Sequence, residues 1–113
     1  MAYIEITPAE GVWTVRTDDG VLVESRNAMS LKEGDYGSVI YFPRDDVAMA
    51  LLEASERSSH CPHKGDAEYF HYVGASARID DVAWSYPKVI KDEVTAIEGY
   101  LAFYGDKVTV ERV

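Results

Sequence analysis

The residues best suited to chemistry lie together in one short segment, residues 61–69. It contains the only cysteine of the chain, His63, a lysine followed by a glycine, and a tyrosine, and His60 directly precedes it. A thiolate is a nucleophile and a metal ligand, an ammonium group binds anions, and an imidazole carries protons near neutral pH. The spacing matches no established catalytic motif. The segment therefore predicts where a site lies and leaves its chemistry open.

Cys61 and Lys64 are the candidates for a reactive group. Cys61 would be a nucleophile if Lys64 and the nearby histidines favoured its thiolate form. The alternative for Cys61 is a small residue packed at the entry to a turn. The chain has no second cysteine to resolve an oxidised intermediate, which disfavours a reductase.

Lys64 and Gly65 could instead capture an anion. A glycine turn exposes amide hydrogens and the ammonium adds a point charge, which together suit a carboxylate or a phosphate. The chain lacks the glycine-rich Gly-Lys-Ser/Thr loop of nucleotide-binding proteins. A plain turn with an exposed lysine is the equally consistent alternative.

Metal binding is disfavoured, although His60, Cys61 and His63 offer nitrogen and sulfur donors. Consecutive residues of an extended strand point to opposite sides, and a fourth ligand would have to come from elsewhere. We therefore expect no metal and no other cofactor.

Aromatic residues could form the wall of a pocket beside this segment. Trp84 and Tyr86 share one face of an expected strand, and Tyr69 and Tyr72 lie on another. Large rings supply contact area and polar tips, although a small β domain also uses such rings as core. Arg44 would bind a ligand anion or pair with a nearby carboxylate. The predicted ligand-binding residues are Cys61, His63, Lys64, Gly65, Tyr69, Trp84, Tyr86 and Arg44.

Strands dominate the expected structure. Residues 12–17 and 21–25 are rich in β-formers and flank an Asp-Gly pair, which predicts a hairpin. Further strands are expected over residues 39–42, 67–73 and 82–86, and a loop over residues 30–37. Residues 88–98 fit either a loop or a short helix, and a final hairpin is expected from residues 99–104 and 107–113.

One short α-helix is expected within residues 43–55. Val47, Ala50, Leu51 and Ala54 follow the spacing of one apolar helical face. Many short strands with one helix predict a mainly β domain, and closely spaced turns favour antiparallel pairing.

Size and charge limit the classes of function. The chain has 113 residues and is expected to form one domain over residues 1–113, with a formal net charge of −9. Such a surface repels phosphate backbones and anionic lipids, so we expect no nucleic-acid or membrane partner. The first residues lack the pattern of a signal peptide, and a single cysteine fits a reducing compartment. We therefore expect a soluble cytoplasmic protein; the sequence leaves its oligomeric state open.

Four blocks of sequence carry a resemblance to a known family. They are Tyr41-Phe42-Pro43-Arg44-Asp45-Asp46-Val47 with Leu51-Leu52-Glu53, then Cys61-Pro62-His63-Lys64-Gly65-Asp66-Ala67-Glu68-Tyr69, Ala83-Trp84-Ser85-Tyr86-Pro87 and Ile97-Glu98-Gly99-Tyr100-Leu101-Ala102-Phe103-Tyr104. In this order they resemble the domain of unknown function numbered 427, catalogued under a nucleotidyltransferase-like label. His63 stands where the family commonly has an aromatic residue.

The resemblance implies a small β-tent fold of two antiparallel sheets, and it supplies no function. The paired Cys-x-x-Cys zinc knuckles of other β-tent families are absent, so structural zinc is not carried over. The nucleotidyltransferase label has no support, because no Gly-Ser pair precedes an Asp-x-Asp metal site.

Three functions fit these observations. The preferred hypothesis is a small-molecule-binding domain whose pocket is formed by the Cys-Pro-His-Lys-Gly turn and the aromatic residues. The first alternative is an enzyme that uses Cys61 or Lys64 as its reactive group. The second is a protein-interaction module with an exposed aromatic patch. A concave pocket favours the first two, and a flat aromatic surface favours the third.

Overall fold

Short antiparallel strands form three sheets in the computed structural model, which describes residues 3–113. The first sheet contains β1 (Ile4–Pro8), β4 (Met29–Glu33) and β5 (Ser38–Tyr41), and the second contains β10 (Thr109–Arg112), β2 (Trp13–Thr17) and β3 (Gly20–Ser25). The third runs in the order β6 (Leu52–Cys61), β7 (Gly65–Val73), β8 (Arg78–Ser85) and β9 (Leu101–Phe103). The predicted mainly β, antiparallel class is confirmed, with three sheets in place of the two that the resemblance implied.

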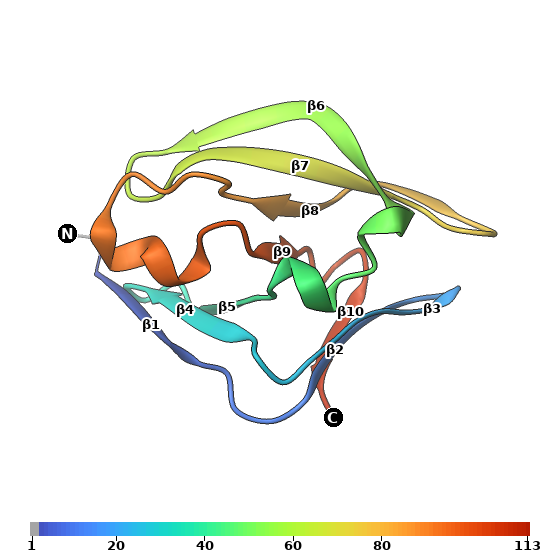
Figure 1. Cartoon of the computed structure of the whole chain (residues 1–113), viewed down its shortest axis with the longest axis horizontal. Coiled ribbons are helices and arrows are strands. Elements are labelled where there is room, and N and C mark those ends of the chain that lie inside the picture. Colours follow the sequence, from blue (N-terminus) through green and yellow to red (C-terminus); the bar gives the residue numbers. More distant parts are fainter. Residues whose placement is uncertain (1–2) are drawn as a thin grey trace.

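Figure 1 shows how the sheets are arranged. Strands β6, β7 and β8 follow one another across the upper half of the molecule, and the strands of the other two sheets lie below. The turn η3 (Asp92–Ile97) closes the left end, so residues 88–98, which fit either a loop or a helix, contain a short 3₁₀ helix. The predicted hairpin at the Asp-Gly pair is confirmed, because β2 and β3 pair from Thr17 and Gly20 onward.

The α-helix predicted within residues 43–55 is wrong. This segment forms two 3₁₀ turns, η1 (Arg44–Asp46) and η2 (Met49–Leu51), and then enters β6. Leu52 pairs with Tyr72 of β7, and Val47 forms a bridge with Val23 of β3. Pairing with neighbouring strands therefore overrides the helical spacing of the apolar residues. No helix within residues 3–113 is long and apolar enough to cross a membrane.

Two further expectations need correction. The last two strands do not form a hairpin with each other: β9 pairs with β8, and β10 pairs with β2. The segment expected as a loop over residues 30–37 begins with strand β4, which pairs with both β1 and β5. In each case a strand lies against a partner distant in sequence, which the local turn signals do not reveal.

The third sheet contributes to two hydrophobic cores, because consecutive residues of a strand point to opposite faces. The β2–β3 core contains Val15, Leu22, Val23, Phe42, Phe70, Tyr72, Val82, Ala83, Leu101 and Phe103, among others. The β4–β5 core contains Leu31, Tyr41, Ala67, Tyr69, Tyr86, Val94, Ile97 and Ala102. Neighbours such as Tyr69 and Phe70 therefore belong to different cores.

The end of β5 is joined to the start of β9 by a pair of backbone hydrogen bonds. The N–H of Phe42 donates to the carbonyl of Leu101 over 2.7 Å, and the N–H of Leu101 donates to the carbonyl of Phe42 over 2.8 Å. Both side chains are fully buried. This junction connects the first sheet to the third and holds the two cores side by side.

A second connection joins the tips of the β2–β3 and β7–β8 hairpins, which both lie at the right of Figure 1. The carboxylate of Asp19 accepts hydrogen bonds from the hydroxyls of Tyr72, over 2.8 Å, and Ser76. These bonds, with that of Ser76 first in size, lower the pKa of Asp19 below its ordinary value. Gly74 leaves the space for this contact, since a Cβ there would collide with Tyr72 and Asp19.

We predict that Asp19→Asn lowers the melting temperature at neutral pH, because the charged acceptor of two hydrogen bonds is lost. A lowered pKa in the folded state means that the contribution of Asp19 is complete above the unfolded value of about 4 and is lost as the pH falls through the folded value. Thermal unfolding of both proteins at several pH values measures this. Asp18→Asn, at an exposed neighbour, is the control; an equal effect of both substitutions would contradict the prediction.

Candidate functional site

A cavity of about 250 Å³ opens beside the β4–β5 core. Its walls come from strands β4, β5, β7 and β8 and from the segments that follow β4, β6, β8 and β9. The lining residues are Leu31, Glu33, Tyr36, Gly37, Val39, Tyr41, Lys64, Tyr69, Trp84, Tyr86 and Tyr104. Aromatic rings and one acid–base pair therefore enclose the same space.

The aromatic wall is ordered by contacts between its rings. Trp84 meets Tyr41 edge to face, with ring centroids 6.4 Å apart and an interplanar angle of 85°, and it lies 4.6 Å from the ring of Tyr104. Its indole N–H donates a hydrogen bond to the hydroxyl of Tyr41 over 3.3 Å. Trp84 is half-buried, so it is a wall of the cavity as well as a support for the core.

Lys64 and Glu33 form the charged part of the cavity. The ammonium of Lys64 donates to the carboxylate of Glu33 over 2.7 Å, and Lys64 is only 7% exposed. Burial lowers the pKa of Lys64, but the hydrogen bond to Glu33 and the negative charge that Cys61 and Tyr41 can carry outweigh it, so the pKa lies above its ordinary value. The amine stays protonated and has no lone pair for nucleophilic attack, which favours binding over catalysis by Lys64.

Tyr86 gives the cavity a free polar group. Its hydroxyl makes no hydrogen bond to the part of the chain that the structure describes, and it is not among the fully enclosed atoms. Burial, followed by the negative charges that Tyr41 and Cys61 can carry, raises the pKa of Tyr86, so the hydroxyl remains a hydrogen-bond donor. The ammonium of Lys64 lies 5.7 Å from the centroid of the same ring.

Four of the predicted ligand-binding residues lie on this cavity: Lys64, Tyr69, Trp84 and Tyr86. The other four, Cys61, His63, Gly65 and Arg44, do not line it. Cys61 is half-buried and packs against the β4–β5 core. His63 is half-buried in the turn between β6 and β7. Neither the cysteine nor the histidine therefore forms part of the cavity wall.

Gly65 supports the backbone. Its φ is +124°, and a Cβ added there would lie 2.8 Å from the carbonyl oxygen of Lys88. Gly65 forms a bridge with Val89, and the N–H of Ile90 donates to the carbonyl of Lys64 over 3.1 Å. The absence of a side chain thus lets the segment after β8 lie against the turn that carries Lys64.

Arg44 lies on the opposite face of the third sheet from the cavity. Its guanidinium donates to the carboxylate of Glu68 over 2.6 Å, to the hydroxyl of Ser85 over 3.3 Å and to the carbonyl of Gly99 over 2.8 Å. Glu68 and Ser85 are cross-strand partners, as are Tyr69 and Trp84, and the period of two sends these two pairs to opposite faces. Arg44 therefore holds the sheet together and is not a ligand contact in the cavity.

Sequence reasoning missed Glu33, Tyr41 and Tyr104 as cavity residues. The sequence does contain a signal for Glu33. Apolar and polar residues alternate from Met29 to Lys32 as in a strand, which places Glu33 on the same face as Met29 and Leu31. For Tyr41 the sequence indicates only a place in the strand expected over residues 39–42. Tyr104 reaches the cavity because β9 pairs with β8 instead of with β10.

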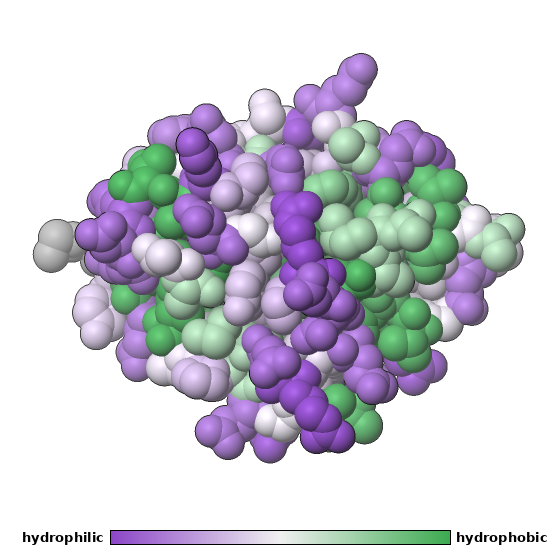
Figure 2. Space-filling view, in the orientation of Figure 1, coloured by the Kyte–Doolittle hydropathy of each residue, from purple (hydrophilic) through white to green (hydrophobic). Residues whose placement is uncertain are grey.

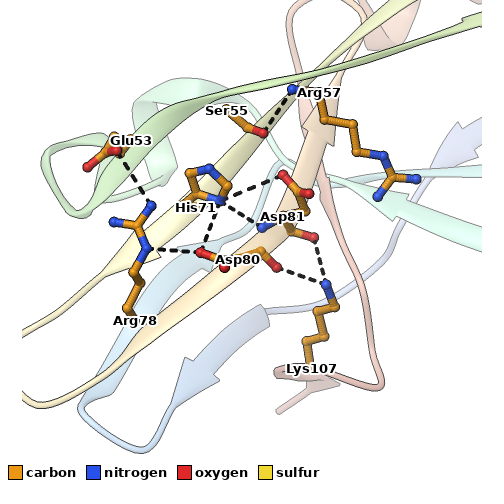
Figure 3. A network of polar contacts seen from close by, with 8 residues as sticks. All are labelled: Glu53, Ser55, Arg57, His71, Arg78, Asp80, Asp81 and Lys107. Atoms are coloured by element: carbon orange, nitrogen blue, oxygen red, sulfur yellow. Dashed lines mark hydrogen bonds and ion pairs between the residues drawn. The ribbon is translucent and has the colours of Figure 1, made fainter.

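Figure 3 shows a second cluster of polar groups, around a bulge in β8. Asp81 has a φ of +48°, and its N–H donates to Nδ1 of His71 over 3.0 Å, while Lys107 donates to the carbonyls of Asp80 and Asp81. Since Nδ1 accepts this bond, neutral His71 carries its proton on Nε2 and cannot use that atom as a base. The cluster stabilises the bulge. Within residues 3–113, no three potential metal ligands lie close enough together to hold an ion.

Residues 5–113 match the profile of a family described as a domain of unknown function (DUF427), whose profile carries a nucleotidyltransferase-like name. This chain belongs to the DUF427 family. The suspected family is thereby confirmed over almost the whole length. No curated protein matches the chain significantly.

One apolar patch of this DUF427 domain lies away from the cavity. A hollow of about 170 Å³ at the Asp19 end is lined by Val21, Leu22, Leu51, Tyr72 and Ala75. Figure 2 shows apolar side chains gathered at that end, on the right of the face in view. This patch is mainly aliphatic. Tyr36, the most exposed aromatic residue among residues 3–113 at 92%, lies at the cavity instead.

The Lys64–Glu33 pair yields a stability prediction for this DUF427 domain. Lys64→Met should lower the free energy of unfolding by roughly 1–3 kcal/mol, since it leaves the Glu33 carboxylate without its partner. Glu33→Gln with Lys64→Met should recover part of this loss, because no unpaired charge remains. Urea unfolding measures both. A double variant less stable than Lys64→Met alone would contradict the assignment.

The stability that the Lys64–Glu33 pair contributes should depend on pH. The pKa of Lys64 is raised in the folded state, so its contribution is complete below the unfolded value of about 10.4 and disappears as the pH rises through the folded value. On the alkaline side, the difference in unfolding free energy between the native protein and Lys64→Met should therefore persist until strongly alkaline pH and narrow there.

Gly65→Ala should destabilise the fold by roughly 1–3 kcal/mol, through an unfavourable φ and a collision with the Lys88 carbonyl. Gly20→Ala is the matched control, because Gly20 has a similar φ of +130° with no atom within 4 Å of an added Cβ. Denaturant unfolding should show a larger loss of unfolding free energy for Gly65→Ala than for Gly20→Ala. Equal losses would show that the close approach of the chain at Gly65 contributes nothing.

Proposed function

We propose that this DUF427 domain binds a small molecule in the aromatic cavity between β4, β5, β7 and β8. The observation that carries the proposal is the convergence of an ion pair with a buried lysine and of a free hydroxyl on one aromatic enclosure. Lys64 and Glu33 supply charge, Tyr86 supplies a donor, and Trp84 supplies a flat apolar surface. Ligand pockets generally combine apolar walls with a few polar groups that orient the ligand.

The size of the cavity favours a ligand of one or two rings. Its volume of about 250 Å³ lies just below the range of roughly 300–1,000 Å³ for pockets that hold drug-sized ligands. The rings that form the wall hold one another in place, so the site is formed in advance and a ligand loses little free energy in ordering it.

A role in catalysis has less support. Lys64 is protonated and paired, and Cys61 lies outside the cavity wall. The net charge of −9 disfavours nucleic acid as a ligand, and the single cysteine fits a reducing compartment, so we place the proposed binding function in the cytoplasm.

A fragment screen by amide NMR tests the proposal. Fragments that bind should shift the signals of cavity residues such as Leu31, Val39 and Tyr69 together. Val39→Phe should abolish these shifts, because the added ring occupies the cavity that Val39 lines. Val73→Phe is the matched control, since Val73 is an exposed strand residue outside the cavity.

The proposal fails if no fragment shifts the cavity signals, or if Val39→Phe remains folded and binds every fragment as the native protein does. Tyr86→Phe provides a finer measurement. It should weaken the binding of fragments that carry a hydrogen-bond acceptor and leave the affinity for purely apolar fragments unchanged, because it removes only the free hydroxyl.

A further inference from the structure

Arg57 places an unpaired cation against the cavity wall. Its guanidinium carbon lies 4.3 Å from the centroid of the Tyr69 ring, and Tyr69 lines the cavity. Arg57 is exposed and forms no ion pair with any residue of the described range 3–113. Figure 3 shows its guanidinium extended away from the neighbouring network of charges. The protein thus leaves this cation without a carboxylate of its own.

The backbone of β6 positions Arg57 there. The pairing of β6 with β7 shifts between Ala54 and Ser58, so residues 55–57 bulge opposite Tyr69. The N–H of Arg57 donates to the hydroxyl of Ser55 over 3.0 Å, and the hydroxyls of Ser59 and Tyr69 lie 2.8 Å apart. Stacking on an aromatic ring restrains a guanidinium while leaving its N–H donors, which lie in the guanidinium plane, available.

Arg57 also acts on a second wall residue, Tyr104. Burial and the neighbouring Tyr69 raise the pKa of Tyr104, and the positive charge of Arg57 opposes this rise. The guanidinium therefore lies within reach of two cavity tyrosines. The lining carboxylate, Glu33, is held by Lys64, so the pair contributes no net charge and Arg57 supplies the free positive charge.

We propose that the ligand of this cavity is a small monocarboxylic acid with a flat apolar body, and that Arg57 selects its carboxylate. The body lies against Trp84 and Tyr86, and the carboxylate extends past Tyr69 to meet the guanidinium, because Arg57 contacts the wall residue Tyr69 without lining the cavity itself. A guanidinium matches a carboxylate through two parallel hydrogen bonds. This inference rests on the function proposed above and specifies the charge of the ligand.

Three compounds with the same ring test the charge directly: phenylacetate, phenylacetamide and 2-phenylethylamine. They present an anion, a neutral amide and a cation. Titration followed by amide NMR should show phenylacetate binding about tenfold or more tightly than phenylacetamide, as expected for a charge-assisted hydrogen bond, and the amine binding most weakly. Arg57→Gln should lower the affinity for phenylacetate to nearly that for phenylacetamide and leave the affinity for phenylacetamide unchanged. Arg26→Gln, at another exposed arginine, removes the same charge elsewhere and should leave the preference intact.

The outcomes separate this inference from the proposed function. Equal binding of the three compounds in the cavity, or tightest binding of the amine, overturns selection of a carboxylate while the cavity remains a binding site. An unchanged preference in Arg57→Gln overturns the role of Arg57. Binding of none of the three overturns the inference, and the fragment screen decides separately whether the cavity binds small molecules at all.

Discussion

The alternation of side chains along β7, β8 and β9 is the constraint on which the rest of the structure depends. Their side chains alternate between the β2–β3 core and the β4–β5 core, where the cavity opens, except beside the bulge in β8, where Val82 and Ala83 both lie in the β2–β3 core. The paired hydrogen bonds between Phe42 and Leu101 fix the first sheet against the third. A shift of one residue in any of these pairings would exchange the two faces and remove the aromatic wall.

The candidate site is formed by residues on the same strands. Tyr69 and Trp84 are cross-strand partners on the cavity face, while Arg44 uses the opposite face to tie the same strands together. The turn between β6 and β7 then brings Lys64 to Glu33 at the end of β4. Because Lys64 and Glu33 neutralise each other, their pair gives the cavity no net charge. The guanidinium of Arg57 adds a positive charge beside the wall residue Tyr69.

The sequence predicted the class of fold, the first hairpin and four of the cavity residues, because turn chemistry and the period of two are local signals. It missed the partner of each strand near the ends of the chain and read residues 43–55 as a helix, because strand pairing acts over long distances in sequence. The same limit explains the site. Lys64 was recognised from its turn, whereas Glu33, its partner from a distant strand, was not. Gly65 and Arg44 were distinctive in the sequence because they hold backbone and strands together.

Crystals of the native protein soaked with a library of small ring compounds test the central claim most directly. The account predicts that bound compounds concentrate in the cavity, stacked on Trp84, with a polar atom at the hydroxyl of Tyr86. Compounds that gather in the aliphatic hollow beside Val21 and Leu51 while the aromatic cavity stays empty, or a crystal structure in which the rings fill the cavity, would contradict it.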